Sequence, residues 1–184
     1  MTAMITVVGN PKPHSRTLEV ARRFSLGLRE ALVEAGRPMD EPRVIDLVDY
    51  TADLLGQGGR PGALDDALTG VRQPGGLVVV ASPTFKGAYS GLLKMFMDLL
   101  PQRGLRGTVA VPLMTAASTR HRTVVGHYLG PLLAELGARV PGPGLCVLEA
   151  EFDDLDRHIE GWLCHGLPAV IEALRIPHET AGPR

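Results

Sequence analysis

The segment GNPKPHSRT, residues 9–17, gathers two hydroxyls and a guanidinium where an apolar run gives way to a helical pattern. Ser15, Arg16 and Thr17 would stand at the N-terminus of that helix, where unpaired backbone N–H groups and the macrodipole favour an anion. The segment therefore predicts a site for a phosphate monoester. Plain capping is the alternative, with Ser15 or Thr17 as the N-cap and Arg16 in solvent. The glycine and lysine spacing of a P-loop is absent.

A second segment, SPTFK at residues 82–86, follows the most continuously apolar run, GLVVVA at residues 76–81. A Ser-Pro pair indicates a turn. Phe85 offers an aromatic face, and the backbone N–H groups of residues 84–87 could donate to a planar heterocycle. Lys86 would place positive charge near a ring that becomes anionic on reduction. The alternative is a turn with a surface aromatic and a solvated lysine, although only 4% of the residues are aromatic.

A third segment, TAAST at residues 115–119, follows another apolar run. Its small residues would let the backbone approach a ligand closely, and its hydroxyls could donate hydrogen bonds. A helix entry capped by Ser118 or Thr119 fits the same residues equally well.

The surrounding pattern alternates short apolar runs with helical spacing. Strands are expected at residues 4–9, 43–47, 76–81, 108–114 and 144–150, and helices at 16–36, 63–73, 91–100, 119–138 and 153–175, the last bent or interrupted near Pro168. Residues 50–62 read as a loop. Such alternation predicts an α/β protein with a parallel sheet covered on both faces. We expect a flavodoxin-like three-layer sandwich whose five-stranded parallel sheet has the order 2-1-3-4-5.

In that order the three segments follow strands one, three and four. The carboxyl ends of these strands meet at one crevice, beside the point between strands one and three where the strand order reverses. Each segment is a weak signal by itself. Their convergence predicts one ligand with a phosphate at one end and a planar ring at the other.

Composition narrows the function classes. A net charge of −1 provides no bulk field for nucleic acid or an anionic membrane, and no apolar run approaches the length of a membrane span. Two cysteines, Cys146 and Cys164, without a CxxC pair suit a reducing compartment, and we expect a cytoplasmic protein. The histidines lack metal-ligand spacing, so no metal site is expected. One domain is predicted over residues 1–176, with a loose tail at 177–184.

The blocks GNPKPHSRT, SPTFKGAYSGLLKMFMDLLP and PLMTAAS, each after its strand, resemble the NAD(P)H-dependent FMN reductase family. Within it the chain is most similar to the flavin reductases of two-component alkanesulfonate monooxygenase systems. The resemblance implies a flavodoxin-like fold, FMN as cofactor and NADPH or NADH as reductant. It also implies delivery of reduced FMN to a flavin-dependent monooxygenase, and a homodimer or homotetramer with the helix at 91–100 near an interface.

The resemblance also implies roles for single residues. Ser15, Arg16 and Thr17 would hold the FMN phosphate, with Asn10 of the same loop in the cofactor site. The isoalloxazine would be lined by Pro83, Thr84, Phe85 and Lys86, and its pyrimidine side approached by Thr115, Ala116, Ala117 and Ser118. Relatives often carry two glycines where this chain has Ala116 and Ala117, which would alter the backbone approach there.

The helix at residues 121–138 carries a further implication. In alkanesulfonate-type relatives one inserted residue forms a π-bulge at a tetramer interface near the flavin, and His127 falls at that place. The alternative for His127 is an interface or surface histidine without such a role.

Other functions remain open at this point. An FMN-containing quinone, azo or metal-ion reductase with tightly held FMN would use the same scaffold. A flavodoxin-type electron carrier is usually strongly acidic, which the net charge of −1 argues against. A flavin-free binding module is a further alternative. No general acid or base is assigned, and the residues do not indicate whether NADH or NADPH is preferred.

Overall fold

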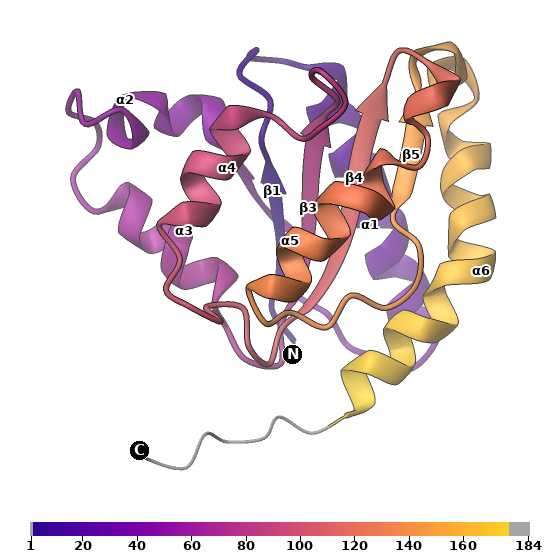
Figure 1. Cartoon of the computed structure of the whole chain (residues 1–184). Coiled ribbons are helices and arrows are strands. Elements are labelled where there is room, and N and C mark those ends of the chain that lie inside the picture. The colour runs from indigo at the N-terminus through magenta and orange to yellow at the C-terminus, as the bar shows by residue number, and fades with distance from the viewer. Residues whose placement is uncertain (1, 177–184) are drawn as a thin grey trace.

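A parallel sheet of five strands forms the centre of the molecule in the computed structural model, which describes residues 2–176 (Figure 1). The strands are β1 (Met4–Val8), β2 (Arg43–Asp46), β3 (Leu77–Pro83), β4 (Val109–Ala116) and β5 (Leu145–Leu148). Their order is β2-β1-β3-β4-β5, and every neighbouring pair is parallel. The predicted fold class and strand order are therefore confirmed. The tail predicted at 177–184 lies outside the described residues.

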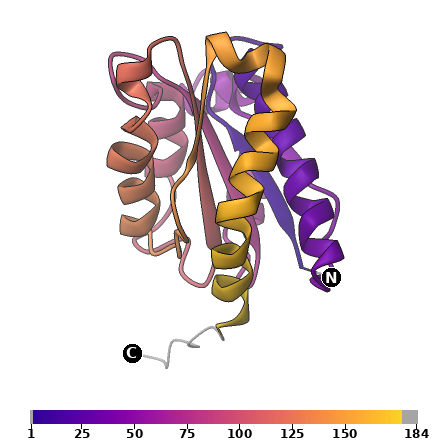
Figure 2. The same cartoon turned by 90° about the vertical axis from the view of Figure 1, so that its right-hand side faces the viewer.

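Helices cover both faces of the sheet. One face carries α1 (Arg16–Glu34) and α6 (Leu155–Arg175), and the other carries α3 (Ala63–Val71), α4 (Gly91–Asp98) and α5 (Gly130–Glu135). Figure 2 shows the sheet edge-on between these layers, with α5 on one side and α1 on the other. The strands read as continuous apolar runs because their alternate side chains enter two separate cores. Along β1, for example, Val7 belongs to one core and Val8 to the other.

Three helical segments differ from the sequence prediction. The expected loop at 50–62 is helical at its start, as the 3-10 turn η1 (Leu47–Tyr50) and α2 (Thr51–Leu54). The expected helix at 119–138 is divided into a 3-10 turn η2 (Thr119–His121), a π-helix η3 (Val125–Leu129) and α5. Pro131 lies in the first turn of α5, which follows η3 directly, so its missing N–H leaves a carbonyl of η3 without the usual helical partner. The helix α6 runs without interruption through Pro168.

Two strands extend further than predicted at the carboxyl edge of the sheet. β3 includes Ser82 and Pro83, and β4 includes Thr115 and Ala116. The Ser-Pro turn is thus wrong, because pairing with β4 continues through Pro83 opposite Thr115. The next backbone N–H, of Thr84, donates to the Thr115 carbonyl at 2.8 Å. This pairing keeps the second and third predicted site segments side by side.

Replacing Gly9 is expected to destabilise the fold, because α4 packs directly on the end of β1. A Cβ at Gly9 would lie 2.5 Å from the Cβ of Leu93, closer than packed carbon atoms approach. We expect Gly9→Ala to lower the free energy of unfolding by about 1–3 kcal/mol, measured by urea denaturation. Gly91→Ala is the matched control, since a Cβ there meets nothing within 4 Å. Equal stability of both variants would contradict the packing argument.

Candidate active site

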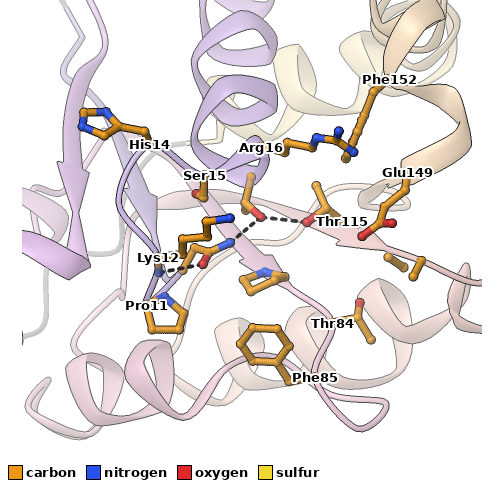
Figure 3. A pocket seen from close by; sticks show the side chains of 15 residues that line it. Pro11, Lys12, His14, Ser15, Arg16, Thr84, Phe85, Thr115, Glu149 and Phe152 are labelled. Atoms are coloured by element: carbon orange, nitrogen blue, oxygen red, sulfur yellow. Dashed lines mark hydrogen bonds between the residues drawn. The ribbon is translucent and has the colours of Figure 1, made fainter.

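A cavity of about 560 Å³ lies at the carboxyl ends of β1, β3 and β4 (Figure 3). The predicted residues that line it are Asn10, Ser15, Arg16, Thr17, Pro83, Thr84, Phe85, Thr115, Ala116 and Ala117. Lys86 and Ser118, also predicted, are not among the lining residues. Five lining residues were not predicted, namely Pro11, Lys12, His14, Glu149 and Phe152. The convergence of the three segments on one cavity is confirmed.

The first loop is shaped by local hydrogen bonds that lead the chain into α1. The Asn10 Oδ1 accepts the Lys12 N–H at 2.9 Å, and His14 adopts a left-handed φ of 51°. Ser15 then caps α1, accepting the Leu18 N–H on its Oγ at 3.2 Å. The capping alternative for Ser15 is therefore observed. Its hydroxyl hydrogen is still available to a ligand, as are the unpaired N–H groups that begin any helix.

Thr17 joins the first loop to the end of β4. Its Oγ1 accepts a hydrogen bond from Asn10 Nδ2 at 3.0 Å and lies 2.8 Å from Thr115 Oγ1. All three side chains are buried, and Thr17 is only 2% exposed. Figure 3 draws these hydrogen bonds as dashed lines among the side chains that line the cavity. The Thr17 hydroxyl thus serves first to hold the loops together, a function that the sequence did not indicate.

The second segment forms a two-residue hairpin turn. Phe85 and Ala88 exchange backbone hydrogen bonds of 2.9 and 3.1 Å, and Lys86 and Gly87 between them have φ values of 54° and 81°. Lys86 therefore lies at the tip of the turn, and Phe85 remains 49% exposed beside the cavity. The N–H groups of Thr84 and Phe85 are already paired within the protein, so the prediction that they donate to a ligand is wrong.

Two serines fix this hairpin to the rest of the sheet edge. Ser90 caps α4 by accepting the Leu93 N–H at 3.0 Å, and its hydroxyl donates to the Gly9 carbonyl. The Ser90 N–H in turn donates to Ser82 Oγ at 2.9 Å. A serine directly before an apolar helical run was the available signal for this cap.

The third segment contributes less than expected. Ala117 follows β4 directly and lines the cavity. Ser118 makes no side-chain cap, and its backbone carbonyl accepts the His121 N–H at 2.9 Å. Side-chain capping by Ser118, the alternative for this residue, is thus not observed.

A wall of the cavity comes from the 3-10 segment η4 (Glu149–Asp154), which follows β5. Glu149 and Phe152 line the cavity from this segment, and the Arg16 Cζ lies 5.2 Å from the centre of the Phe152 ring. In the sequence, the only signal that this segment belongs to the site was its place after the fifth strand, because the carboxyl end of β5 lies at the same edge of the sheet.

Glu151 fastens η4 to its neighbours. It accepts the Leu148 N–H at 2.9 Å, pairs with Arg122 from the segment after β4, and lies 3.9 Å from His158 Nε2 of α6. Burial by itself would raise the pKa of Glu151. The hydrogen bonds from Arg122 and Leu148 and the nearby His158 outweigh burial, so this pKa is lowered.

The sequence model of NADPH-dependent FMN reductases matches residues 2–153. The chain is 32% identical to the FMN reductase (NADPH) of Pseudomonas aeruginosa, over 82% of this chain and 79% of that protein. It is 35% identical to the Escherichia coli FMN reductase (NADPH), over 74% and 68%, and 32% identical to the NADH-dependent FMN reductase SfnF of Pseudomonas fluorescens, over 71% and 72%. The chain belongs to the NADPH-dependent FMN reductase family. It is therefore an oxidoreductase that uses FMN and a nicotinamide cofactor, as the resemblance implied.

Solved structures agree with this FMN reductase fold. An oxidoreductase from Corynebacterium diphtheriae superposes with a TM-score of 0.79 at 25% identity, over 94% of this chain and 98% of that one. The apo form of the NADH:FMN oxidoreductase EMOB gives 0.72 at 24% identity, over 95% and 89%. Within residues 2–176 no helix is long and apolar enough to cross a membrane, and no group of three His, Cys, Asp or Glu could hold a metal ion.

The cavity of this FMN reductase fits the flavin chemically. Of the buried polar side-chain atoms in residues 2–176 that lack a hydrogen-bond partner, only Thr84 Oγ1 belongs to a residue that lines the cavity. A buried hydroxyl without a partner is unfavourable unless a ligand supplies one. Arg16 supplies a cation at the start of α1, Phe85 an aromatic face, and Ala116 and Ala117 leave room for a ring.

Glu151→Gln is expected to destabilise the protein in a pH-dependent manner. Because folding lowers the pKa of Glu151, its contribution is fully present above the unfolded-state pKa, near pH 4.3, and is lost as the pH falls through the folded-state value. We expect a loss of about 1 kcal/mol or less at pH 7, since the Arg122 partner is partly exposed. Thermal unfolding from pH 7 to pH 3 should show the difference from wild type shrinking.

The control for this prediction is Glu172→Gln, which removes an ion pair with Arg175 in which both side chains are more than half exposed. It should change stability little at any pH. A Glu151→Gln deficit that stays constant down to pH 3 would contradict the assigned ionisation.

Proposed function

We propose that this chain reduces FMN as a dissociable substrate, with NADPH or NADH as reductant, and supplies reduced FMN to a flavin-dependent monooxygenase. The observation that carries the proposal is the cavity at the carboxyl ends of β1, β3 and β4 in a chain of the FMN reductase family. Its relatives are named for FMN as the compound that is reduced, and their names include both NADPH and NADH.

The residues divide into those that meet the ligand and those that hold the site together. Arg16, the Ser15 hydroxyl and the first N–H groups of α1 would bind the phosphate, because together they offer a cation and unpaired donors. Asn10, Thr17 and Thr115 would position that loop through their mutual hydrogen bonds.

The ring would be bound by Pro83, Thr84, Phe85, Ala116 and Ala117, which line the remaining part of the cavity. Bound FMN supplies the redox chemistry by accepting a hydride from the nicotinamide. The protein orients the ring and shields it from water on the side that faces the sheet. Lys86 and Ser118 lie outside the lining, so they are omitted from the proposed site.

Several features favour weak binding and hence release of FMN. The Thr17 hydroxyl and the backbone N–H groups of Thr84 and Phe85 are already paired inside the protein. Phe85 is 49% exposed, so the ring would not be enclosed there. These paired groups would have to exchange partners to bind the ring or phosphate, and a hydrogen bond that only exchanges partners adds little.

The proposal is tested by NADPH and NADH oxidation, with FMN varied from below to well above the concentration of apo protein. We expect the rate to saturate only with FMN in large excess, and flavin fluorescence to report weak binding. If the protein instead holds FMN stoichiometrically and turns over only when a quinone or dye is added, FMN is a prosthetic group. The alternative reading as a quinone, azo or metal-ion reductase would then replace the proposal.

The π-helix η3 supports a link between flavin release and assembly. His127 lies within it, and the Gly130 N–H bonds to the Val125 carbonyl five residues back, the π-helical spacing. Neither His127 nor Tyr128 lines the cavity. Three large hydrophobic residues are exposed here, namely Tyr128 in η3, Met95 in α4 and Leu99 directly after α4, which favours a homodimer or homotetramer through this face.

Deleting His127 is expected to convert η3 into a regular α-helix, because it removes the one extra residue of the turn. We expect tighter FMN binding, slower turnover with excess FMN and an altered oligomeric state, measured by fluorescence titration, steady-state kinetics and light scattering. His127→Ala is the control, since it keeps the chain length and removes only the imidazole. Wild-type behaviour of the deletion variant in all three measurements would rule out a role for the insertion.

A further inference from the structure

Arg16 and Phe152 form a contact between the first helix and the last 3-10 segment, 136 residues apart in the sequence. The guanidinium carbon lies 5.2 Å from the ring centre, within the range of a cation–π interaction. Figure 3 shows the guanidinium reaching toward the Phe152 ring from the start of α1. Both residues line the cavity, so the contact lies at the proposed phosphate end.

Phe152 is the one partner of the Arg16 guanidinium within residues 2–176, because no ion pair or hydrogen bond to it is formed there. Its neighbour Glu19 on α1 pairs with Arg23 instead, at 3.9 Å. A long side chain at an exposed helix start samples many rotamers when nothing holds it. The stack on Phe152 therefore decides where this positive charge is placed.

Arg16 also lines a second cavity, of about 310 Å³, whose carboxylates would attract its guanidinium. This cavity shares Arg16, Glu149 and Phe152 with the first cavity, and its lining also includes Glu19 and Asp153. Three carboxylates thus line the second cavity, and of these Glu19 and Asp153 do not line the first. Without the aromatic face, Coulomb attraction would draw the guanidinium toward Glu19 and Asp153 and away from the first cavity.

Phe152 is itself held in place from two sides. Its ring packs against the core between the sheet and helices α1 and α6. The adjacent Glu151 ties η4 to the Leu148 backbone and to Arg122. The ring is therefore a fixed platform, whereas the guanidinium that rests on it is otherwise unrestrained.

We propose that Phe152 is a positioning residue that holds the Arg16 guanidinium for the FMN phosphate and thereby favours FMN over riboflavin. The inference rests on the phosphate-binding role of Arg16 in the proposed function. Because Phe152 acts through Arg16, it strengthens binding of the phosphate group and leaves binding of the flavin ring unchanged.

The test compares FMN and riboflavin binding to the apo protein by flavin fluorescence. Phe152→Leu keeps an apolar side chain against the core and removes the aromatic face. We expect it to raise the Kd for FMN about two- to fivefold, the size of an exposed cation–π contact, and to leave the Kd for riboflavin unchanged. Phe152→Tyr keeps the face and should bind FMN like wild type. Thermal unfolding confirms that each variant is folded.

A double-mutant cycle separates positioning from a structural role. Arg16→Met should weaken FMN binding about tenfold or more, as the loss of a charged hydrogen bond predicts, and Phe152→Leu should add nothing in that background. Tyr50→Leu is the matched control, because Arg60 stacks on Tyr50 at the same 5.2 Å and neither residue lines the cavity. It should leave both flavin affinities unchanged.

Three outcomes would overturn the proposal: equal weakening of FMN and riboflavin by Phe152→Leu, no effect on either, or the same loss with and without Arg16. Each outcome can be distinguished from failure of the proposed function, which is read from multiple turnovers with excess FMN. An Arg16→Met variant with wild-type FMN affinity would remove the phosphate role of Arg16 and the inference with it, while dissociable FMN reduction by the wild-type protein would stand.

Discussion

The hydrogen bond between the hydroxyls of Thr17 and Thr115 closes the carboxyl edge of the sheet where the site is formed. Loops leave parallel strands at this edge, so their backbone and side-chain polar groups lose the regular pairing of the sheet. Asn10 extends the same network, while Ser82 and Ser90 satisfy groups on the neighbouring loop. Buried networks of this kind are stable only when every member is paired. The shape of the cavity therefore depends on hydroxyls that a ligand does not need to touch.

Polar groups that hold the loops together have less capacity left to bind a ligand. A hydroxyl that already bonds Asn10 and Thr115 has limited capacity left for a phosphate, and the paired N–H groups of Thr84 and Phe85 have none for a ring. Groups in the lining that are still available to FMN include the Arg16 guanidinium, the start of α1, the hydroxyls of Ser15 and Thr84, and the aromatic face of Phe85. A site whose loops are already joined by hydrogen bonds is preformed, so little ordering of the loops is needed when a ligand binds.

Sequence reasoning predicted the architecture because the strands are apolar on both sides, which only a covered parallel sheet explains. It also located most of the cavity, since strands one, three and four must meet beside the switch point. It failed where tertiary pairing overrides local signals. Ser82 and Pro83 look like a turn but continue β3, because β4 runs beside them. Lys86 lies at the tip of a hairpin and outside the cavity lining, because the two positive φ angles there follow from backbone pairing, which residue type alone does not reveal.

The wall formed by η4 was not foreseen for a topological reason. The crossover from β1 to β2 runs in the opposite direction across the sheet from the crossovers that lead to β3, β4 and β5. Crossovers are right-handed, so α1 lies on the opposite face from α3, α4 and α5. The chain leaving β5 returns to the face of α1, where α6 packs against it. The segment between β5 and α6 must then pass the N-terminus of α1. The proposed phosphate end of the site therefore combines residues from the N-terminal and C-terminal parts of the chain.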